Sequence, residues 1–391
     1  MGWVINAMAS VVSVMLNMDK WTAVWLCVFI ALVYAILSGF WGVVVTDLVQ
    51  FCIAMFGSIA LAIIALDHVG GMNNLLLKLS QLMGSDAVNE NTLKFIPPVP
   101  DAAYNTSTFW ESPFSKFLIF ITVMWWSHHG TDGGGYIIQR MSSAKNERHA
   151  LLATLWFNLA HYAFRVWPWI IVAVVSIVMF PMIPASYSEL GVKAGYPLVM
   201  NALLGPGLKG ILIVSFLAAF MSTIDTHLNW GASYLINDVY KRFFKPNESE
   251  KHYVFIGKII TVVLMILAAF TALKMQSISK AWEFIFSMGA GIGLVLILRW
   301  FWWRINAWSE ITALATSIII TITLELIAWS QTISAGETYS LFGAAPILFG
   351  ITLQVHHKLM IIVPCAIIAW VSVTFMTRPE PSDQLNIFYE R

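Results

Sequence analysis

Long apolar stretches, each closed by a short polar segment, run through the whole chain. A helix of roughly 20 mostly apolar residues crosses the hydrocarbon core of a bilayer. Stretches near that length lie at about residues 3–17, 22–39, 43–66, 114–138, 151–180, 208–236, 253–274, 282–303, 306–329 and 357–376. This pattern predicts an all-α polytopic membrane protein with about ten spans, of which the first is short.

One stretch, residues 213–238, carries polar side chains in its middle. Small and polar residues recur there every three or four positions and so share one side of a helix, which we call the polar stripe. The stripe consists of Ser215, Ala219, Ser222, Thr226, Asn229 and Ser233. Asp225 lies beside it. The opposite side is apolar, with Phe216, Phe220, Ile224 and Leu228.

Polar groups inside a membrane span are costly, so each one marks a candidate functional site. The stripe offers hydroxyl oxygens and a neighbouring carboxylate, without a cationic side chain. Oxygen ligands suit a hard cation such as Na⁺. The alternative is a helix–helix contact face, because Ala, Ser and Thr allow close approach and interhelical hydrogen bonds.

The span at 114–138 is predicted to be broken. Its apolar run 117–126 is followed by SHHGTDGGG, where four glycines disfavour a continuous helix. Irregular backbone at membrane depth is tolerated where it lines a cavity, and an interrupted span is typical of a transporter's central site. The residues expected to face that cavity are Trp125, Trp126, Ser127, His128, His129, Thr131 and Asp132.

Two other interpretations of this segment remain. The helix ends at Trp126 and the glycines form a surface loop, although the apolar sequence from Tyr136 onward argues against that. The histidine pair with Asp132 also suggests a metal. Adjacent histidines point about 100° apart on a helix, so they cannot both ligate from one face.

Other polar groups lie inside or near apolar spans. Asn158, His161 and Arg165 share a face at spacings of three and four, and Arg165 is either a substrate contact or half of a structural ion pair. Asp47 and Gln50 share a face near the start of another span. Asp47 either lines the path of a cation or is an interfacial charge. The small residues at 286–293 predict close helix packing.

Composition and charge agree with the membrane class. The 391 residues are 59% hydrophobic and 11% charged, against about 25% charged in average soluble chains. A net charge of +1 does not suggest a nucleic-acid partner. Basic residues gather in 139–150, in 241–251, at 299–304 and at Arg378, which are separated by even numbers of spans. The positive-inside rule therefore places all four on the cytoplasmic side, in a multi-pass protein of the plasma (inner) membrane.

Three motifs together resemble the sodium:solute symporter family, the group of the sodium/glucose cotransporters. YAILSGFWGVVVTDLVQ resembles its Tyr…Gly-Gly…Thr-Asp-x-x-Gln segment, with Ser38 where the first Gly is common. GGGYIIQRMSSAKNERHA resembles its Gln-Arg…Ala-Lys turn. The stretch from LKGILIVSFLAAFMSTIDTHLNW to NDVYKR resembles its Ala-Ala-x-Met-Ser-Thr…Asp-x-Tyr-Lys segment, with Trp230 in place of a small residue.

The resemblance implies a partial five-plus-five inverted-repeat (LeuT-like) fold, with residues 1–391 as one transporter domain. The first two core helices of the family plan are not in this sequence, so we expect the chain to be part of a longer protein. Ala219, Ser222 and Thr223 match the family's Na⁺ ligands on the eighth core helix. Asp47 matches its fifth-helix aspartate, and Asp225 and Thr226 are near enough to join that second cation site.

The function expected from this resemblance is Na⁺-coupled symport of a small organic solute, possibly a sugar or polyol, across a lipid bilayer. A carboxylate or amino acid is the alternative solute, because Arg165 suits a carboxylate. A transporter-like sensor fused to a signalling module is another class, and a channel or scaffold a third. We expect the protein not to be an enzyme.

Overall fold

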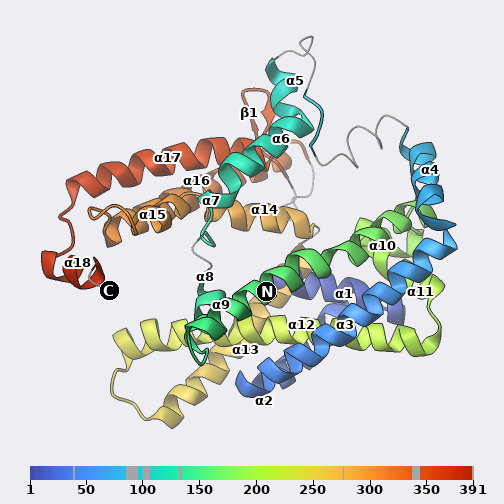
Figure 1. Ribbon diagram of the computed structural model, residues 1–391, viewed down its shortest axis with the longest axis horizontal. Helices are drawn as coiled ribbons and strands as arrows, with labels where there is room; N and C mark the ends of the chain where they lie inside the picture. The colour runs from blue at the N-terminus through green and yellow to red at the C-terminus, as the bar shows by residue number, and fades with distance from the viewer. Residues whose placement is uncertain are drawn as a thin grey trace. The chain divides into compact units, whose positions relative to one another are not determined.

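The computed structural model describes residues 1–37, 40–84, 96–99, 106–131, 134–275, 277–336 and 344–389 (Figure 1). It divides into two compact units. Unit 1 comprises Met1–Val88 and Leu159–Ile278, and unit 2 comprises Asn89–Asn158 and Ser279–Arg391. Each unit combines segments that are far apart in the sequence.

Unit 1 is built from helices. They are α1 (Gly2–Leu16), α2 (Lys20–Leu37), α3 (Phe40–His68), α4 (Gly71–Met83), the π-helix η3 (Leu159–Phe164), α10 (Val166–Met179), the 3₁₀-helix η4 (Ala185–Ala194), α11 (Gly195–Leu203), α12 (Pro206–Tyr234), the π-helix η5 (Leu235–Phe244) and α13 (Glu250–Lys274).

Apolar cores hold unit 1 together, and two of them include buried side chains of α12. In the first, α1 packs with α2, α12 and α13, and the α12 side chains Phe220, Ile224 and Leu228 are buried there. This is the apolar face predicted for that span. The second core joins α3, α10, α11 and α12, and its α12 member is Leu212. Gly57 of α3 faces Leu212, whose Cγ would lie 2.9 Å from a Cβ at that position, so the two helices meet closely there.

Unit 2 contains the broken span and the C-terminal helices. Its elements are α5 (Thr106–Glu111), α6 (Pro113–Ile119), the π-helix η2 (Phe120–Met124), α7 (Trp125–Ser127), α8 (Gly134–Ser142), α9 (Glu147–Asn158), α14 (Ile278–Met288), α15 (Gly293–Leu298), α16 (Ala307–Ser334), β1 (Ile347–Leu348), β2 (Ile351–Thr352), α17 (Val355–Met376) and α18 (Ser382–Tyr389). The two short strands pair antiparallel.

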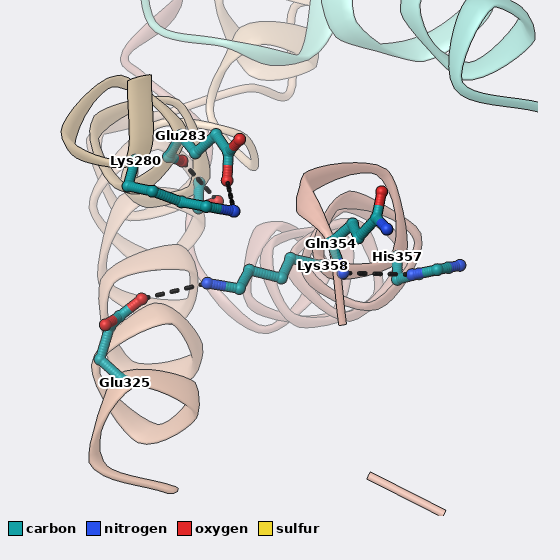
Figure 2. Close-up of polar contacts among 7 residues, drawn as sticks. Lys280, Glu283, Glu325, Gln354, His357 and Lys358 are labelled. Carbon is teal, nitrogen blue, oxygen red and sulfur yellow. Dashed lines mark hydrogen bonds and ion pairs between the residues drawn. The ribbon is translucent and has the colours of Figure 1, made fainter. Parts of the chain in front are cut away.

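The helices α16 and α17 pack side by side and share a buried ion pair. Lys358 Nζ lies 3.0 Å from Glu325 Oε1, and the two side chains are only 8% and 12% exposed (Figure 2). Asn306 caps the start of α16 and donates from Nδ2 to Thr377 Oγ1 at 2.8 Å, beyond the end of α17. Polar contacts therefore join the two helices at more than one level.

Six helical segments among the described residues are long and apolar enough to cross a membrane. They are Leu48–His68, Glu147–Met179, Pro206–Phe244, Glu250–Lys274, Ala307–Ser334 and Val355–Met376. The pair Gly2–Leu16 and Lys20–Ala35 adds a seventh if it is one span, bent by 115°. Two predicted spans, 114–138 and 282–303, are divided into shorter helices. The prediction of an all-α, multi-pass membrane fold is thus confirmed.

Candidate ion and solute site

The polar stripe lies on α12, away from the buried apolar face. Ser222, Thr223 and Thr226 are half-buried, whereas Ala219 and Asn229 are exposed. Helical periodicity explains this division, since Ile224 and Leu228 are fully buried on the other side. The predicted separation of the two faces is therefore seen from Ala219 to Asn229, whereas Ser215, the first member of the stripe, is buried.

The hydroxyl groups of two threonines on α12 donate hydrogen bonds to backbone carbonyls of the same helix. Thr223 Oγ1 donates to Ala219 O at 2.8 Å, and Thr226 Oγ1 donates to Ser222 O at 2.9 Å. A hydroxyl that has given its proton to a carbonyl keeps its lone pairs as acceptors. These two oxygens thus present the electron-rich side that a cation requires. Asp225 is buried, with 1% of its surface exposed.

A buried acceptor on α3 was not among the predicted ligands. Gln50 Oε1 is buried and has no hydrogen-bond donor in the part of the chain that the structure describes. The helices α3 and α12 pack side by side and run in opposite directions (Figure 1). Gln50 precedes Gly57 by seven residues on α3, and Ala219 follows Leu212 by seven residues on α12. Because Gly57 contacts Leu212 and the helices are antiparallel, Gln50 lies level with Ala219. The Asp47 side chain lies outside the described residues.

The span at 114–138 is interrupted, as predicted. The helix α7 ends at Ser127, and His128 is extended with φ −87° and ψ 164°. Gly130 N donates to His128 Nδ1 at 2.8 Å, and Thr131 Oγ1 donates to His128 O at 2.6 Å, so local hydrogen bonds hold the turn. The helix α8 then resumes at Gly134. Asp132 lies outside the described residues.

The side chains at this helix break face different directions. Ser127 is buried, and its Oγ has no partner among the described residues. His128 packs its ring edge-on to Phe286 at 5.8 Å between centroids. Trp126 is half-buried, whereas Trp125 and His129 are exposed. Ser127 and His128 are therefore the inward-facing members of the predicted set.

A second interrupted helix packs against the first. The helices α14 and α15 are separated by a turn at 289–292. A Cβ at Gly293 would collide with the backbone of Trp126, Ser127 and His128, and a Cβ at Gly289 with the ring of His129. The two breaks thus meet backbone to backbone. This confirms the predicted close packing of 286–293, although the partner was not predicted.

Arg165 interacts with an aromatic ring. Its guanidinium lies 5.0 Å from the ring centroid of Trp169, whose Nε1 donates to Ser58 Oγ of α3 at 3.1 Å. The Arg165 Nε is buried without a partner, and the described residues contain no ion pair of Arg165. Trp169 follows Arg165 by four residues, a helical spacing that could have indicated this contact.

Asn158 and His161, which were predicted to share a helix face with Arg165, lie next to and within a π-helix. Asn158 Nδ2 donates to Thr154 O at 2.9 Å, and the His161 ring stands edge-on to Tyr162 at 4.6 Å. The π-helix η3 covers 159–164, so the α-helical spacing that predicted a common face does not hold between them.

Unit 2 also contains a cavity of about 630 Å³ beside the break. Met124 lines it one residue before α7, together with the ion pair of Lys280 and Glu283, whose atoms lie 3.0 Å apart (Figure 2). His356 also lines it. Its Nε2 lies 2.7 Å from Trp110 O, and its Nδ1 is buried without a partner among the described residues. The lining of the cavity includes both apolar and charged side chains.

These features define a multi-pass membrane protein with a polar transmembrane stripe and two interrupted helices. The chain belongs to the sodium:solute symporter family, whose profile matches residues 4–333. It is 26% identical over 312 residues to the osmoregulated proline transporter OpuE of Bacillus subtilis, covering 76% of this chain and 56% of that protein. It is 25% identical over 300 residues to the sodium/mannose cotransporter SLC5A10 of Bos taurus, covering 71% and 49%.

A solved structure shows the same fold. It is that of a Na⁺-coupled sialic acid symporter in a substrate-bound, outward-open state, with a TM-score of 0.59 and 17% identity, covering 96% of this chain and 72% of that one. The predicted LeuT-like fold and the location in the plasma membrane are thereby confirmed. The family also supports Na⁺ as the coupling ion. The chain spans about half to three fifths of the length of these curated relatives.

Proposed function

We propose that the protein is a secondary active transporter that couples Na⁺ entry to uptake of a small organic solute by alternating access. The observation that carries the proposal is the interrupted span at His128 in a chain of this family. Interrupted helices free backbone groups to bind a solute inside the membrane. One Na⁺ moving inward yields about 2.3 kcal/mol per 100 mV, enough for roughly 50-fold accumulation.

The proposed Na⁺ ligands lie on or beside the polar stripe of α12, except Asp47, which belongs to α3. Ala219, Ser222 and Thr223 form one set, and Asp47, Asp225 and Thr226 form the second cation site or the exit path. The orientation of the Thr223 and Thr226 hydroxyls supports this assignment, because both keep acceptor lone pairs. We add Gln50, whose buried carbonyl oxygen has no donor in the described part of the chain.

The proposed solute ligands lie at and near the helix break. A sugar or polyol suits the set at the break, because an indole ring covers a sugar face while Ser127 and His128 bond hydroxyl groups. The members of that set are Trp125, Trp126, Ser127, His128, His129 and Asp132. Asn158, His161 and Arg165 form a second set in the following span. We further propose that both units belong to one transporter domain spanning 1–391.

A carboxylate or amino acid is the second candidate solute. Two observations favour it. The buried Arg165 Nε is a cationic donor without a partner among the described residues. Relatives of this chain include proteins named as proline transporters. Arginine binds carboxylates through paired hydrogen bonds, so an amino acid fits this group better than a neutral sugar.

An uptake screen tests the proposal. Vesicles from cells that express the protein are loaded with K⁺ and diluted into Na⁺ or K⁺ buffer containing labelled glucose, mannose, inositol, proline or sialic acid. We expect at least one solute to accumulate above its outside concentration in Na⁺ and not in K⁺. Uptake that proceeds equally in K⁺ would contradict Na⁺ coupling, and a preference for proline would select the second candidate.

A further inference from the structure

A second pocket lies in unit 1, near the end of the polar stripe. It has a volume of about 320 Å³ and lies among the end of α2, the junction of α12 with η5, and the first half of α13. Its polar lining consists of Asn229, Ser233, Asn237, Lys258 and Thr261. Asn229 and Ser233 are the last members of the stripe, beyond the proposed Na⁺ ligands. They therefore call for a separate explanation.

The chemistry of this pocket favours an anion. Its lining contains two amides, two hydroxyls and one ammonium group, and no carboxylate. Thr261 Oγ1 donates to Gly257 O at 2.9 Å, so this hydroxyl is already used. The Lys258 ammonium is exposed and has no hydrogen bond or ion pair in the described part of the chain. An anion with several acceptor oxygens would satisfy both the charge and the donors.

The pocket lies near the level of the lipid headgroups, on the side of the membrane where the basic turns lie. Four basic residues stand in the η5–α13 turn, namely Lys241, Arg242, Lys245 and Lys251, and the positive-inside rule makes that turn cytoplasmic. Lys258 follows Lys251 by seven residues, or about 10 Å along a helix. Lys241 is itself engaged, at 3.9 Å from Glu250 and over the ring of Tyr253. Lys258 is thus the cation of the pocket.

Apolar side chains beside the pocket face outward. Ile259 and Val263, which follow Lys258 toward the middle of the span, are 45% and 50% exposed. In a membrane span, such side chains contact acyl chains. A soluble phosphate would leave this apolar border without a partner, whereas a phospholipid places its headgroup in the pocket and its chains on the border.

We propose that this pocket binds the phosphate headgroup of an anionic phospholipid from the cytoplasmic leaflet. Lys258 supplies the charge, and Asn229, Ser233 and Asn237 donate hydrogen bonds to the phosphate or glycerol oxygens. The three donors lie along the α12–η5 helix, and all three line the pocket. The proposal is independent of the proposed transport function, because lipid binding requires neither Na⁺ nor solute.

Native mass spectrometry tests the proposal with phosphatidylglycerol and phosphatidylcholine as probes. The protein is purified in detergent, each lipid is titrated, and bound lipid is counted. Lys258→Ala is compared with Lys274→Ala, an exposed lysine at the opposite end of the same helix. We expect Lys258→Ala to weaken phosphatidylglycerol binding about fivefold, and Lys274→Ala and phosphatidylcholine binding to change little.

A second variant keeps the test decisive if Lys258→Ala fails to fold. Ser233→Leu fills the pocket without removing a charge and should also lower phosphatidylglycerol binding. Equal loss in the Lys258 and Lys274 variants, or equal binding of both lipids, would overturn the proposal. Complete displacement of the lipid by millimolar glycerol phosphate would overturn it as well, because the ligand would then be a soluble phosphate.

Discussion

Lys358 and Glu325 form a buried ion pair between α16 and α17. Each ammonium or carboxylate taken out of water must be compensated by a partner, and here the two face each other at 3.0 Å. Removing one partner leaves the other buried and uncompensated. Breaking the pair should therefore lower the free energy of unfolding by more than the net attraction of the two charges contributes to it.

We predict that Lys358→Ala lowers the free energy of unfolding by about 3–5 kcal/mol, because the buried Glu325 carboxylate then loses the ammonium group that faces it. The double variant Glu325→Leu with Lys358→Met should recover most of this loss. The exposed pair of Lys245 and Glu248 is a control, and Lys245→Ala should cost about 0–1 kcal/mol. Thermal unfolding in detergent measures all three. A neutral effect of Lys358→Ala would show that water reaches the pair.

Lys193 in η4 gives a prediction about pH. Burial, and secondly the positive charge of Lys20, lower the pKa of Lys193 from 10.5 to about 8. The Lys193 ammonium donates to the buried Asn6 Oδ1 at 3.0 Å. Because the unfolded chain keeps the higher pKa, it binds more protons than the folded chain between pH 8 and 10.5. Stability should therefore rise across this window.

Unfolding of the wild type and of Lys193→Met at pH 7.5 and pH 10 tests this point. The wild type should gain stability relative to the variant as the pH rises, and Lys274→Met should behave as the wild type does. If the free energies of unfolding of the wild type and Lys193→Met change with pH in parallel, then the pKa of Lys193 is the same in the folded and unfolded chain.

At the scale of elements, the contact between two interrupted helices is the most specific feature. A Cβ at Gly293 would meet the backbone around Trp126 and His128, which cannot retreat as a flexible side chain does. Gly293→Ala should therefore lower stability by about 1–3 kcal/mol and abolish uptake. Gly210→Ala in α12 is the matched control, because nothing lies within 4 Å of the added methyl group. Normal uptake by Gly293→Ala would show that transport does not depend on this contact between the two interrupted helices.

The sequence predicted these elements better than it predicted their partners. Glycines at 130–135 indicated the break, and small residues at 286–293 indicated close packing. That the two segments pack on each other depends on the tertiary fold, which local patterns do not encode. The π-helices η2, η3 and η5 were also not predicted, because apolar side chains repeat too similarly in α- and π-helical turns to distinguish them.

The same limit applies to single residues of the site. Helical periodicity placed Ser222 and Thr226 on the face of α12 opposite Ile224, whereas Thr223 was named through the family resemblance. It did not add Gln50 to the ligands, because that role comes from packing between α3 and α12. The contact of Arg165 with Trp169 was overlooked, although a spacing of four residues places the two side chains together. The Lys358–Glu325 pair was likewise missed, since the two residues are 33 positions apart.

At the scale of the whole molecule, the chain is a multi-pass membrane protein of the sodium:solute symporter family. Apolar spans, basic turns and three motifs predicted this class, and the family profile and the fold agree with it. The solute was not predictable in the same way, because it depends on how several short segments meet in space. Relatives of the chain are named for proline, mannose and glucose transport.

The central claim is that the α12 stripe binds the coupling Na⁺, and one measurement tests it most directly. Uptake of the solute found in the screen is measured against Na⁺ concentration for the wild type, for Ser222→Ala with Thr223→Ala, and for the control Ser215→Ala on the same stripe. With expression matched, the double variant should lose Na⁺ dependence while Ser215→Ala keeps it. Unchanged Na⁺ dependence in the double variant would contradict the account.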